Sequence, residues 1–519
     1  MKQDISETRF SRSASGLPRS VGGLDAFIFN LGMISIGVTA AYTQRFGTAF
    51  YPNCSLVIAT LMGALLAGAV ALGFWAWTSS VPRSGGIYVF IARAGFPALG
   101  QAISLVELIA WLFYLCTTSS MFVIMGVAPL AMSFPGPEPY FVHIIAGSPG
   151  LLVVGSFAIW LAAWVAISGM QTFLRSQRII FVIAIIGTLA LFHVLSHGPA
   201  EFHQNFNAAY PSFGQDPYQV VIAHAKAAGW FGAKPGSLKR TVALLVWPFL
   251  ALMAAVFSMN IGGEIRHPAK TQLRAMIGSL AAGALAFLLI AVLAKHSIGN
   301  AFQGAIAYNY ENDSAKGMVY STQVEPYFGY FACLATQSPL MKILITLGFI
   351  CWAWFWIPGI LSYAARVFLA WSTDGAAPAG LAKLHPTRGT PYVAILVAAA
   401  IAQVLLPLIL FTHLIGSLVF ILGIVGAWGA ALCLGALFPV TTPNISADSS
   451  AQENQPPKRL PMSLLCATGA AAILIVGYLL WRDPEAAGHD HNSLAALLLT
   501  FLAGLLFHFS MRIRHRRAP

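Results

Sequence analysis

The chain is dominated by apolar stretches that are each long enough to cross the roughly 30 Å hydrocarbon core of a bilayer. Only 9% of the 519 residues are Asp, Glu, Lys or Arg, whereas about 25% are charged in ordinary soluble domains. So few charges cannot cover the core of a chain that is 58% hydrophobic, which excludes a soluble globular protein. The sequence therefore predicts an all-α membrane protein with twelve transmembrane helices. The predicted spans are 23–43, 55–79, 97–131, 151–168, 179–198, 241–261, 273–294, 341–371, 391–411, 414–438, 462–481 and 492–511.

Twelve spans place both ends of the chain on the same side of the membrane. If that side is the cytoplasm, the cytoplasmic segments hold 20 of the 29 Lys and Arg residues, as the positive-inside rule requires. The net charge of +12 is then explained by the orientation of the chain in the membrane. No basic stripe with interleaved aromatic residues suggests contact with nucleic acid. We expect an integral protein of the cytoplasmic membrane with cytoplasmic termini.

Two polar segments divide the predicted helices into groups. Residues 199–240 form a long extracytoplasmic loop, and residues 439–461, rich in Ser, Asp, Asn, Gln and Pro, form a flexible cytoplasmic linker. The linker separates ten helices from two, and ten helices divide into two five-helix repeats, 23–198 and 241–438. The remaining predicted parts are the N-terminal tail 1–22, two additional helices at 462–511 and the basic tail 512–519.

Two of the spans contain residues that interrupt helices. Irregular backbone is tolerated in a membrane only where protein or a water-filled cavity covers it, and matching interruptions in two repeats indicate a transporter site. In the first span, Gly32 and Gly37 flank Ser35, which permits either unwinding or close packing against a neighbouring helix. In the sixth span, Pro248 lacks a backbone donor, which predicts either an interruption of this helix or a kink without ligand contact.

Three loop motifs occur in order along the chain, all at predicted cytoplasmic positions. Residues 82–88 read Pro-Arg-Ser-Gly-Gly-Ile-Tyr, residues 262–268 read Gly-Gly-Glu-Ile-Arg-His-Pro, and residues 366–378 begin at an arginine and end at a proline. Together they resemble loops of the amino acid–polyamine–organocation permeases, over residues 23 to about 438. The resemblance implies a leucine-transporter-like, five-plus-five inverted repeat, which two additional helices follow.

The resemblance also implies a substrate site at the two interruptions. The α-carboxylate of an amino acid would meet amides of residues 34–37, and its ammonium group would meet carbonyls freed near Gly32 and in residues 249–255. Four charged residues at the cytoplasmic face are candidates for an inner gate of ion pairs; the alternative is that they are topology signals and helix-end caps. The substrate-binding candidates are Gly32, Met33, Ile34, Ser35, Ile36, Gly37, Phe249, Met253, Ala254 and Trp354, with Trp356 as the alternative to Trp354. The gate candidates are Arg83, Glu264, Arg366 and Asp374.

A carboxyl group inside the third span is a candidate for ion coupling. Glu107 lies about ten residues into this span, roughly 15 Å along a helix, and intramembrane carboxylates are costly to bury. Burial favours the protonated form, which suits proton coupling; the alternative is a structural hydrogen bond to a neighbouring helix. The lysine of many proton-coupled relatives is missing near Gly187, and the hydroxyl pair of sodium-coupled relatives is missing near Cys351. The sequence therefore leaves open whether transport is coupled to a proton or to a counter-substrate.

The candidate pocket contains no carboxylate for a basic substrate and no arginine for an acidic one. We therefore expect a secondary active transporter for neutral or apolar amino acids that works by alternating access. The six cysteines show no metal-binding spacing, and no cofactor, metal site or catalytic pair is predicted. The alternatives are a permease or exchanger for amines or other organic solutes, and a solute sensor on a transporter scaffold.

Overall fold

The computed structural model describes residues 17–134, 140–230, 232, 237–313, 320, 322, 325–412, 417–439, 461–483 and 491–517, and this part of the chain is helical apart from its connections. The helices of the first half are α2 (Gly23–Ile34), α3 (Ile36–Phe50), α4 (Leu56–Ser80), α5 (Gly86–Arg93), α6 (Pro97–Phe122), α7 (Ala128–Met132), α8 (Tyr140–Ala146), α9 (Ser148–Ile167), α10 (Met170–Leu195), α11 (Pro199–Ala209) and α12 (Pro217–Ala227). Those of the second half are α13 (Leu238–Leu244), α14 (Val246–Leu252), α15 (Pro268–Ser297), α16 (Asn300–Asp313), α17 (Phe328–Leu334), α18 (Pro339–Thr373), α19 (Tyr392–Phe411), α20 (Ser417–Leu437), α22 (Met462–Arg482) and α23 (His491–Arg517).

Eleven helical stretches in the described ranges are long and apolar enough to cross a membrane. Residues 421–437 of α20 form a shorter apolar helix at the position of the tenth predicted span. Large apolar side chains point away from the protein interior, for example Leu65 at 77% exposure and Val153 at 69%, which suits contact with lipid. The protein is therefore an integral multi-pass membrane protein, as predicted. The count of twelve spans, the inverted repeat and the predicted domain boundaries stay predictions.

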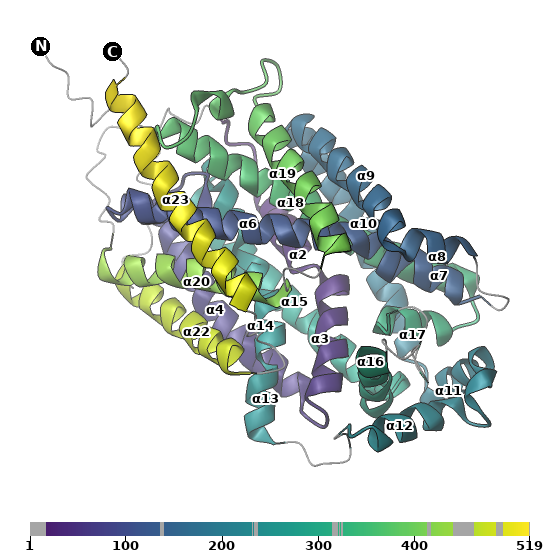
Figure 1. Cartoon of the computed structure of the whole chain (residues 1–519). Helices are drawn as coiled ribbons and strands as arrows, with labels where there is room; N and C mark the ends of the chain where they lie inside the picture. Colours follow the sequence, from purple (N-terminus) through teal and green to yellow (C-terminus); the bar gives the residue numbers. More distant parts are fainter. Residues whose placement is uncertain are drawn as a thin grey trace, which may run out of the picture.

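The predicted loop 199–240 contains two helices, α11 and α12. Figure 1 shows these two helices together with α16 and α17 at one end of the bundle, beyond α3, whereas α23 ends on the opposite side. Contacts of α12 with α16 and of α16 with α3 join this helical cap to the first span. This helical cap, made of α11, α12, α16 and α17, therefore covers the end of α3.

The two C-terminal helices pack directly on the rest of the bundle. Helix α22 contacts α4 and α20, and α23 crosses α6 and packs against it (Figure 1). Gly73 and Gly469 permit the close approach of α4 and α22, because a Cβ on either one would lie 3.2 Å or less from atoms of the other helix. Trp77 on α4 also donates a hydrogen bond from Nε1 to the Ala431 carbonyl of α20 at 3.0 Å. These contacts make the C-terminal helices part of the structural core.

Candidate functional site

The first span is interrupted at Ser35. Helix α2 ends at Ile34 and α3 begins at Ile36, and Ser35 between them has a φ of 52° and a ψ of 69°. A residue with a Cβ is strained in this left-handed conformation. The Ser35 hydroxyl helps to hold it by donating a hydrogen bond to the Trp352 carbonyl of α18 at 2.9 Å. The expected interruption of the first span is thus present, and a serine makes the turn.

The two flanking glycines serve close packing against α18. A Cβ on Gly32 would overlap the ring of Phe355, and a Cβ on Gly37 would lie 2.9 Å from Cδ1 of Trp352. Both alternatives from the sequence therefore apply in this span, but to different residues. Ser35 breaks the helix, and the glycines allow α18 to approach it.

The sixth span stays helical from α13 into α14 but departs from regular α-helix on both sides of α14. A turn at Leu245 separates α13 from α14, three residues before Pro248. The backbone remains α-helical through Phe249, whose amide donates to the Leu245 carbonyl at 3.0 Å, and becomes a 3₁₀ segment over Met253–Glu264. In place of the interruption predicted over 249–255, the span changes from α-helix to 3₁₀-helix at Met253. Runs of 3₁₀ helix this long are uncommon and often mark a hinge.

A central cavity of about 230 Å³ lies where the first and sixth spans meet α6, α18 and α20. Of the substrate-binding candidates, Met33, Met253 and Ala254 line it, and so does Trp356. Trp354 lies outside the lining, with its ring 6.1 Å from that of Phe122. The full lining is Met33, Val38, Thr39, Tyr42, Thr43, Phe46, Phe50, Trp111, Tyr114, Thr117, Thr118, Met121, Trp247, Leu250, Ala251, Met253, Ala254, Trp356, Ile421 and Ile424.

The remaining binding candidates are buried beside the cavity and do not line it. Phe249 is completely buried, and its backbone faces α4, where a Cβ on Gly63 would lie 2.9 Å from the Phe249 nitrogen. The others belong to the turn between α2 and α3 and contribute backbone groups near Met33. These are Gly32, Ile34, Ser35, Ile36 and Gly37.

The polar groups of this turn are partly satisfied within the protein. Trp356 donates from Nε1 to the Met33 carbonyl at 2.8 Å, and Thr39 donates to the Ile34 carbonyl at 2.6 Å. The first amides of a helix have no partner within that helix, and no side chain caps α3. The two carbonyls therefore have partners within the protein, whereas the first amides of α3 have no side-chain cap.

The sequence reasoning missed the wall that α6 contributes. Trp111, Tyr114, Thr118 and Met121 line the cavity at a spacing of three and four residues, which places them on one face of a helix. This pattern is visible in the sequence, where a stripe of aromatic and hydroxyl side chains runs along an otherwise apolar span. This stripe is the sequence feature that could have identified the α6 wall of the cavity.

The cavity lining is uncharged. No Asp, Glu, Lys, Arg or His occurs among its lining residues, all of which are described. Thr43 donates to the Thr39 carbonyl at 2.8 Å and Thr118 to the Tyr114 carbonyl at 2.7 Å, so these donors serve their own helices. The chamber therefore suits a ligand without a charged side chain.

The four gate candidates form two ion pairs. Arg366 on α18 pairs with Glu264 at the end of the 3₁₀ segment. Its Nε donates to Oε1 at 2.9 Å and its Nη2 donates to Oε2 at 3.0 Å. Arg83 contacts Asp374, Nη2 to Oδ1 at 2.9 Å. Glu264 is eleven residues beyond Met253, so roughly 20 Å of 3₁₀ helix separates this pair from the cavity. Their pairing fits the expected inner gate, whose role stays a prediction.

The N-terminal segment adds a contact at the same end that the sequence did not reveal. Val21 donates from its amide to the Glu264 carbonyl at 2.9 Å and accepts from the Arg266 amide at 3.0 Å. This short parallel bridge joins the chain just before α2 to the end of the sixth span. Movement of α2 away from this end requires the bridge to break.

A cluster of ion pairs lies at the opposite end, beside Phe46. Arg45 on α3 is buried and pairs with both Glu311 of α16 and Glu325. Its guanidinium carbon also lies 4.8 Å from the centroid of the Tyr327 ring. The cluster fixes α3, which forms one wall of the cavity, to the helical cap.

Glu107 is completely buried in α6 and lies outside the cavity lining. Its Oε2 accepts a hydrogen bond from the Tyr363 hydroxyl of α18 at 2.7 Å. Its Oε1 accepts from Nε1 of Trp428 of α20 at 2.6 Å. The carboxyl thus makes the inter-helix hydrogen bonds of the structural alternative, while its role in coupling stays a prediction.

An all-helical membrane protein with two interrupted spans around an uncharged chamber has the organisation of a solute transporter. The chain belongs to the amino acid permease family, since the sequence model of that family matches residues 21–504. It is similar to the branched-chain amino acid permease BcaP of Bacillus subtilis (strain 168), with 23% identity over 407 residues that cover 73% of this chain and 72% of the relative. The predicted family is confirmed, and the protein is a permease and not an enzyme.

Proposed function

We propose that the protein is a secondary active transporter that moves neutral, apolar amino acids by alternating access. The central cavity carries this proposal, because it lies beside both interrupted spans and has no charged side chain in its lining. The similarity to a relative named as a branched-chain amino acid permease supports the same substrate class. Aliphatic side chains such as that of leucine are the expected cargo.

The proposed binding mode uses backbone for the charged groups and side chains for the apolar group. The α-carboxylate lies at the first amides of α3, next to Met33 and Val38, where a helix N-terminus favours an anion. The ammonium group lies at the start of the 3₁₀ segment, near Met253 and Ala254. The aliphatic side chain then packs toward Ile424 and the aromatic wall of α6.

The proposed transport cycle starts from the conformation seen here. The ion pairs of Glu264 and Asp374 and the Val21 bridge close one end, which is cytoplasmic if the positive-inside assignment is right. The cavity lining continues from Met33 along α3 to Phe50, toward the other end. Release of the substrate to the closed side requires the two ion pairs and the Val21 bridge to break. The ion pairs of Arg45 keep the opposite end together during this step.

Counterflow in liposomes tests the proposed substrate class. Purified protein is reconstituted with an excess of unlabelled amino acid inside, and uptake of each labelled amino acid is followed. We expect saturable accumulation of leucine, isoleucine or valine, competed by the unlabelled form, and none of lysine or glutamate. Accumulation of amines alone would overturn the substrate class, and saturable binding without any accumulation would instead identify a sensor.

A further inference from the structure

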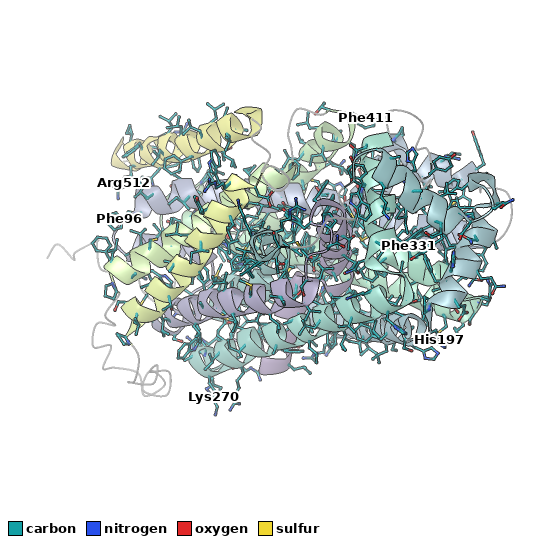
Figure 2. All side chains as sticks on the ribbon, turned by 90° about the horizontal axis from the view of Figure 1, so that it is seen from below. Phe96, His197, Lys270, Phe331, Phe411 and Arg512 are labelled. Atoms are coloured by element: carbon teal, nitrogen blue, oxygen red, sulfur yellow. The ribbon has the colours of Figure 1, made fainter. Side chains whose placement is uncertain are left out.

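A second cavity, of about 710 Å³, lies between the start of α2 and the first turns of α15. It shares no residue with the central cavity. Figure 2 shows Lys270, one of its lining residues, at the periphery of the molecule. The lining consists of Gly23, Leu24, Phe27, His267, Lys270, Thr271, Arg274 and Ala275.

The polar side of this cavity is cationic. Lys270 and Arg274 are exposed, lie one turn apart on α15, and make no ion pair within the described part of the chain. No acidic residue lines the cavity. Asp25, the acidic residue of α2, accepts hydrogen bonds from Arg178 on both carboxylate oxygens, at 2.7 and 2.9 Å. An anion at Lys270 and Arg274 would therefore meet uncompensated positive charge.

The other side of the cavity is apolar and continues along the bundle surface. Leu24 is 63% exposed, and Phe27 packs edge-on against Phe181 of α10 with 6.4 Å between ring centroids. Exposed Ile277 and Leu285 follow Arg274 on the same face of α15. The cations at the end of α15 suit the headgroup of a lipid, and the exposed apolar side chains that follow them suit its acyl chains.

We propose that this cavity binds one anionic phospholipid. Its phosphate lies between Lys270 and Arg274, because lysine and arginine are the usual phosphate ligands and basic pockets between membrane helices hold anionic headgroups. Its acyl chains lie along Leu24, Phe27 and Ile277. Free phosphate would leave this apolar wall unused, which favours a lipid over a soluble anion.

Such a lipid bridges two elements that matter for the transport cycle. Helix α2 precedes the interruption at Ser35, and α15 follows Glu264 and the Val21 bridge. In the proposed transport cycle, a phospholipid held by both helices stabilises the conformation closed at this end, because separation of α2 from α15 would divide its site.

Native mass spectrometry of the purified full chain tests the proposal. The protein is titrated with phosphatidylglycerol or with phosphatidylcholine of the same acyl chains, and bound lipids are counted. The double substitution K270Q/R274Q is expected to weaken retention of one phosphatidylglycerol by about 10- to 30-fold. The control K383Q/R388Q removes two exposed charges from the loop before α19 and is expected to leave retention unchanged. L24E leaves both cations in place, adds an acidic group to the lining and is expected to weaken retention in the same direction.

Three results would overturn the proposal. Equal retention of phosphatidylcholine and phosphatidylglycerol would show that charge is not recognised. Equal losses in K270Q/R274Q and K383Q/R388Q would show a general surface effect, and displacement of phosphatidylglycerol by inorganic phosphate would show a soluble-anion site. Thermal unfolding of each variant in phosphatidylcholine separates loss of binding from loss of fold.

Discussion

Arg366 holds both carboxylate oxygens of Glu264 in a two-point ion pair, with donor–acceptor distances of 2.9 and 3.0 Å. The two residues are only 3% and 2% exposed, so neither charge is solvated by bulk water. The pair joins the end of the sixth span to α18, the helix that supplies Trp356 to the cavity. Any motion that separates the end of the sixth span from α18 must first break this ion pair.

Removing one member of the pair should therefore be costly. E264Q leaves the Arg366 charge buried without a counter-charge, and we expect it to lower the free energy of unfolding by about 3–5 kcal/mol. D374N removes the partner of Arg83, whose side chain is 16% exposed, and should cost less. Thermal or denaturant unfolding in detergent measures both. The double variant E264Q/R366Q should recover part of the loss, and an additive loss would show that the pair is not coupled.

Two properties of Ser35 affect the stability of the turn: its hydroxyl hydrogen bond stabilises the turn, and its Cβ strains it. A pair of substitutions can separate the two effects. S35A and S35G both remove the hydroxyl that donates to Trp352, but only alanine keeps a Cβ in the left-handed region. We expect S35G to be more stable than S35A by about 1–2 kcal/mol, the cost of a Cβ in that conformation. Comparison of their unfolding midpoints checks this, and equal stabilities would mean that the turn is not strained.

Much of the fold was predictable because bilayer thickness fixes the length of apolar runs. The predicted spans overlap the observed helices, and the break of the first span was found from the residues around Ser35. Local sequence cannot distinguish a glycine that unwinds a helix from one that admits a neighbour. The side chains of α18 decide this for Gly32 and Gly37, and α18 is more than 300 residues away in the sequence.

The candidate site was predicted less completely than the fold. Met33, Met253 and Ala254 were identified because they adjoin residues that disturb a helix, whereas the wall from Trp111 to Met121 lies on a regular helix. The choice between Trp354 and Trp356 depended on the rotation of α18, which its neighbours set and its own composition does not. The bridge at Val21 is made by backbone alone and leaves no side-chain signal.

Glu107 offers a test between coupling and structure. The glutamine in E107Q can still accept from Trp428 and donate to the Tyr363 hydroxyl, so we expect near-normal stability and unchanged uptake driven by a pH gradient. E107L should lose about 1–3 kcal/mol for each buried donor left without a partner. Proteoliposomes with an imposed pH gradient measure the uptake. A folded E107Q that no longer responds to the gradient would assign the coupling proton to this carboxyl.

The helical cap contains a carboxylate that should make it sensitive to acid. Hydrogen bonds from His203 at 2.9 Å and Asn207 at 3.0 Å lower the pKa of Asp216, which caps α12. Because the folded-state pKa is lowered, the stabilisation is complete above the ordinary value of about 3.9 and is lost as the pH falls through the folded-state value. Hydrogen exchange in α11 and α12, corrected for intrinsic rates, should rise in that window.

D216N is the matched control for this acid sensitivity. Asparagine is as good a helix cap as aspartate but does not titrate, so exchange in the variant should not depend on pH over the same range. An unchanged acid response in D216N would assign the effect to another group in the cap.

Filling the central cavity should stop transport without unfolding the protein. Ala254 lines the chamber at the start of the 3₁₀ segment, and A254F places a ring in the space proposed for the substrate. V153F adds a similar ring at a 69% exposed position on α9, where it faces outward. We expect A254F to reduce leucine counterflow at least tenfold, through loss of binding, while V153F retains it. Because overpacking costs about 1–3 kcal/mol, unfolding midpoints must accompany the uptake data. Normal counterflow by a folded A254F would remove the substrate from this chamber and with it the proposed binding mode.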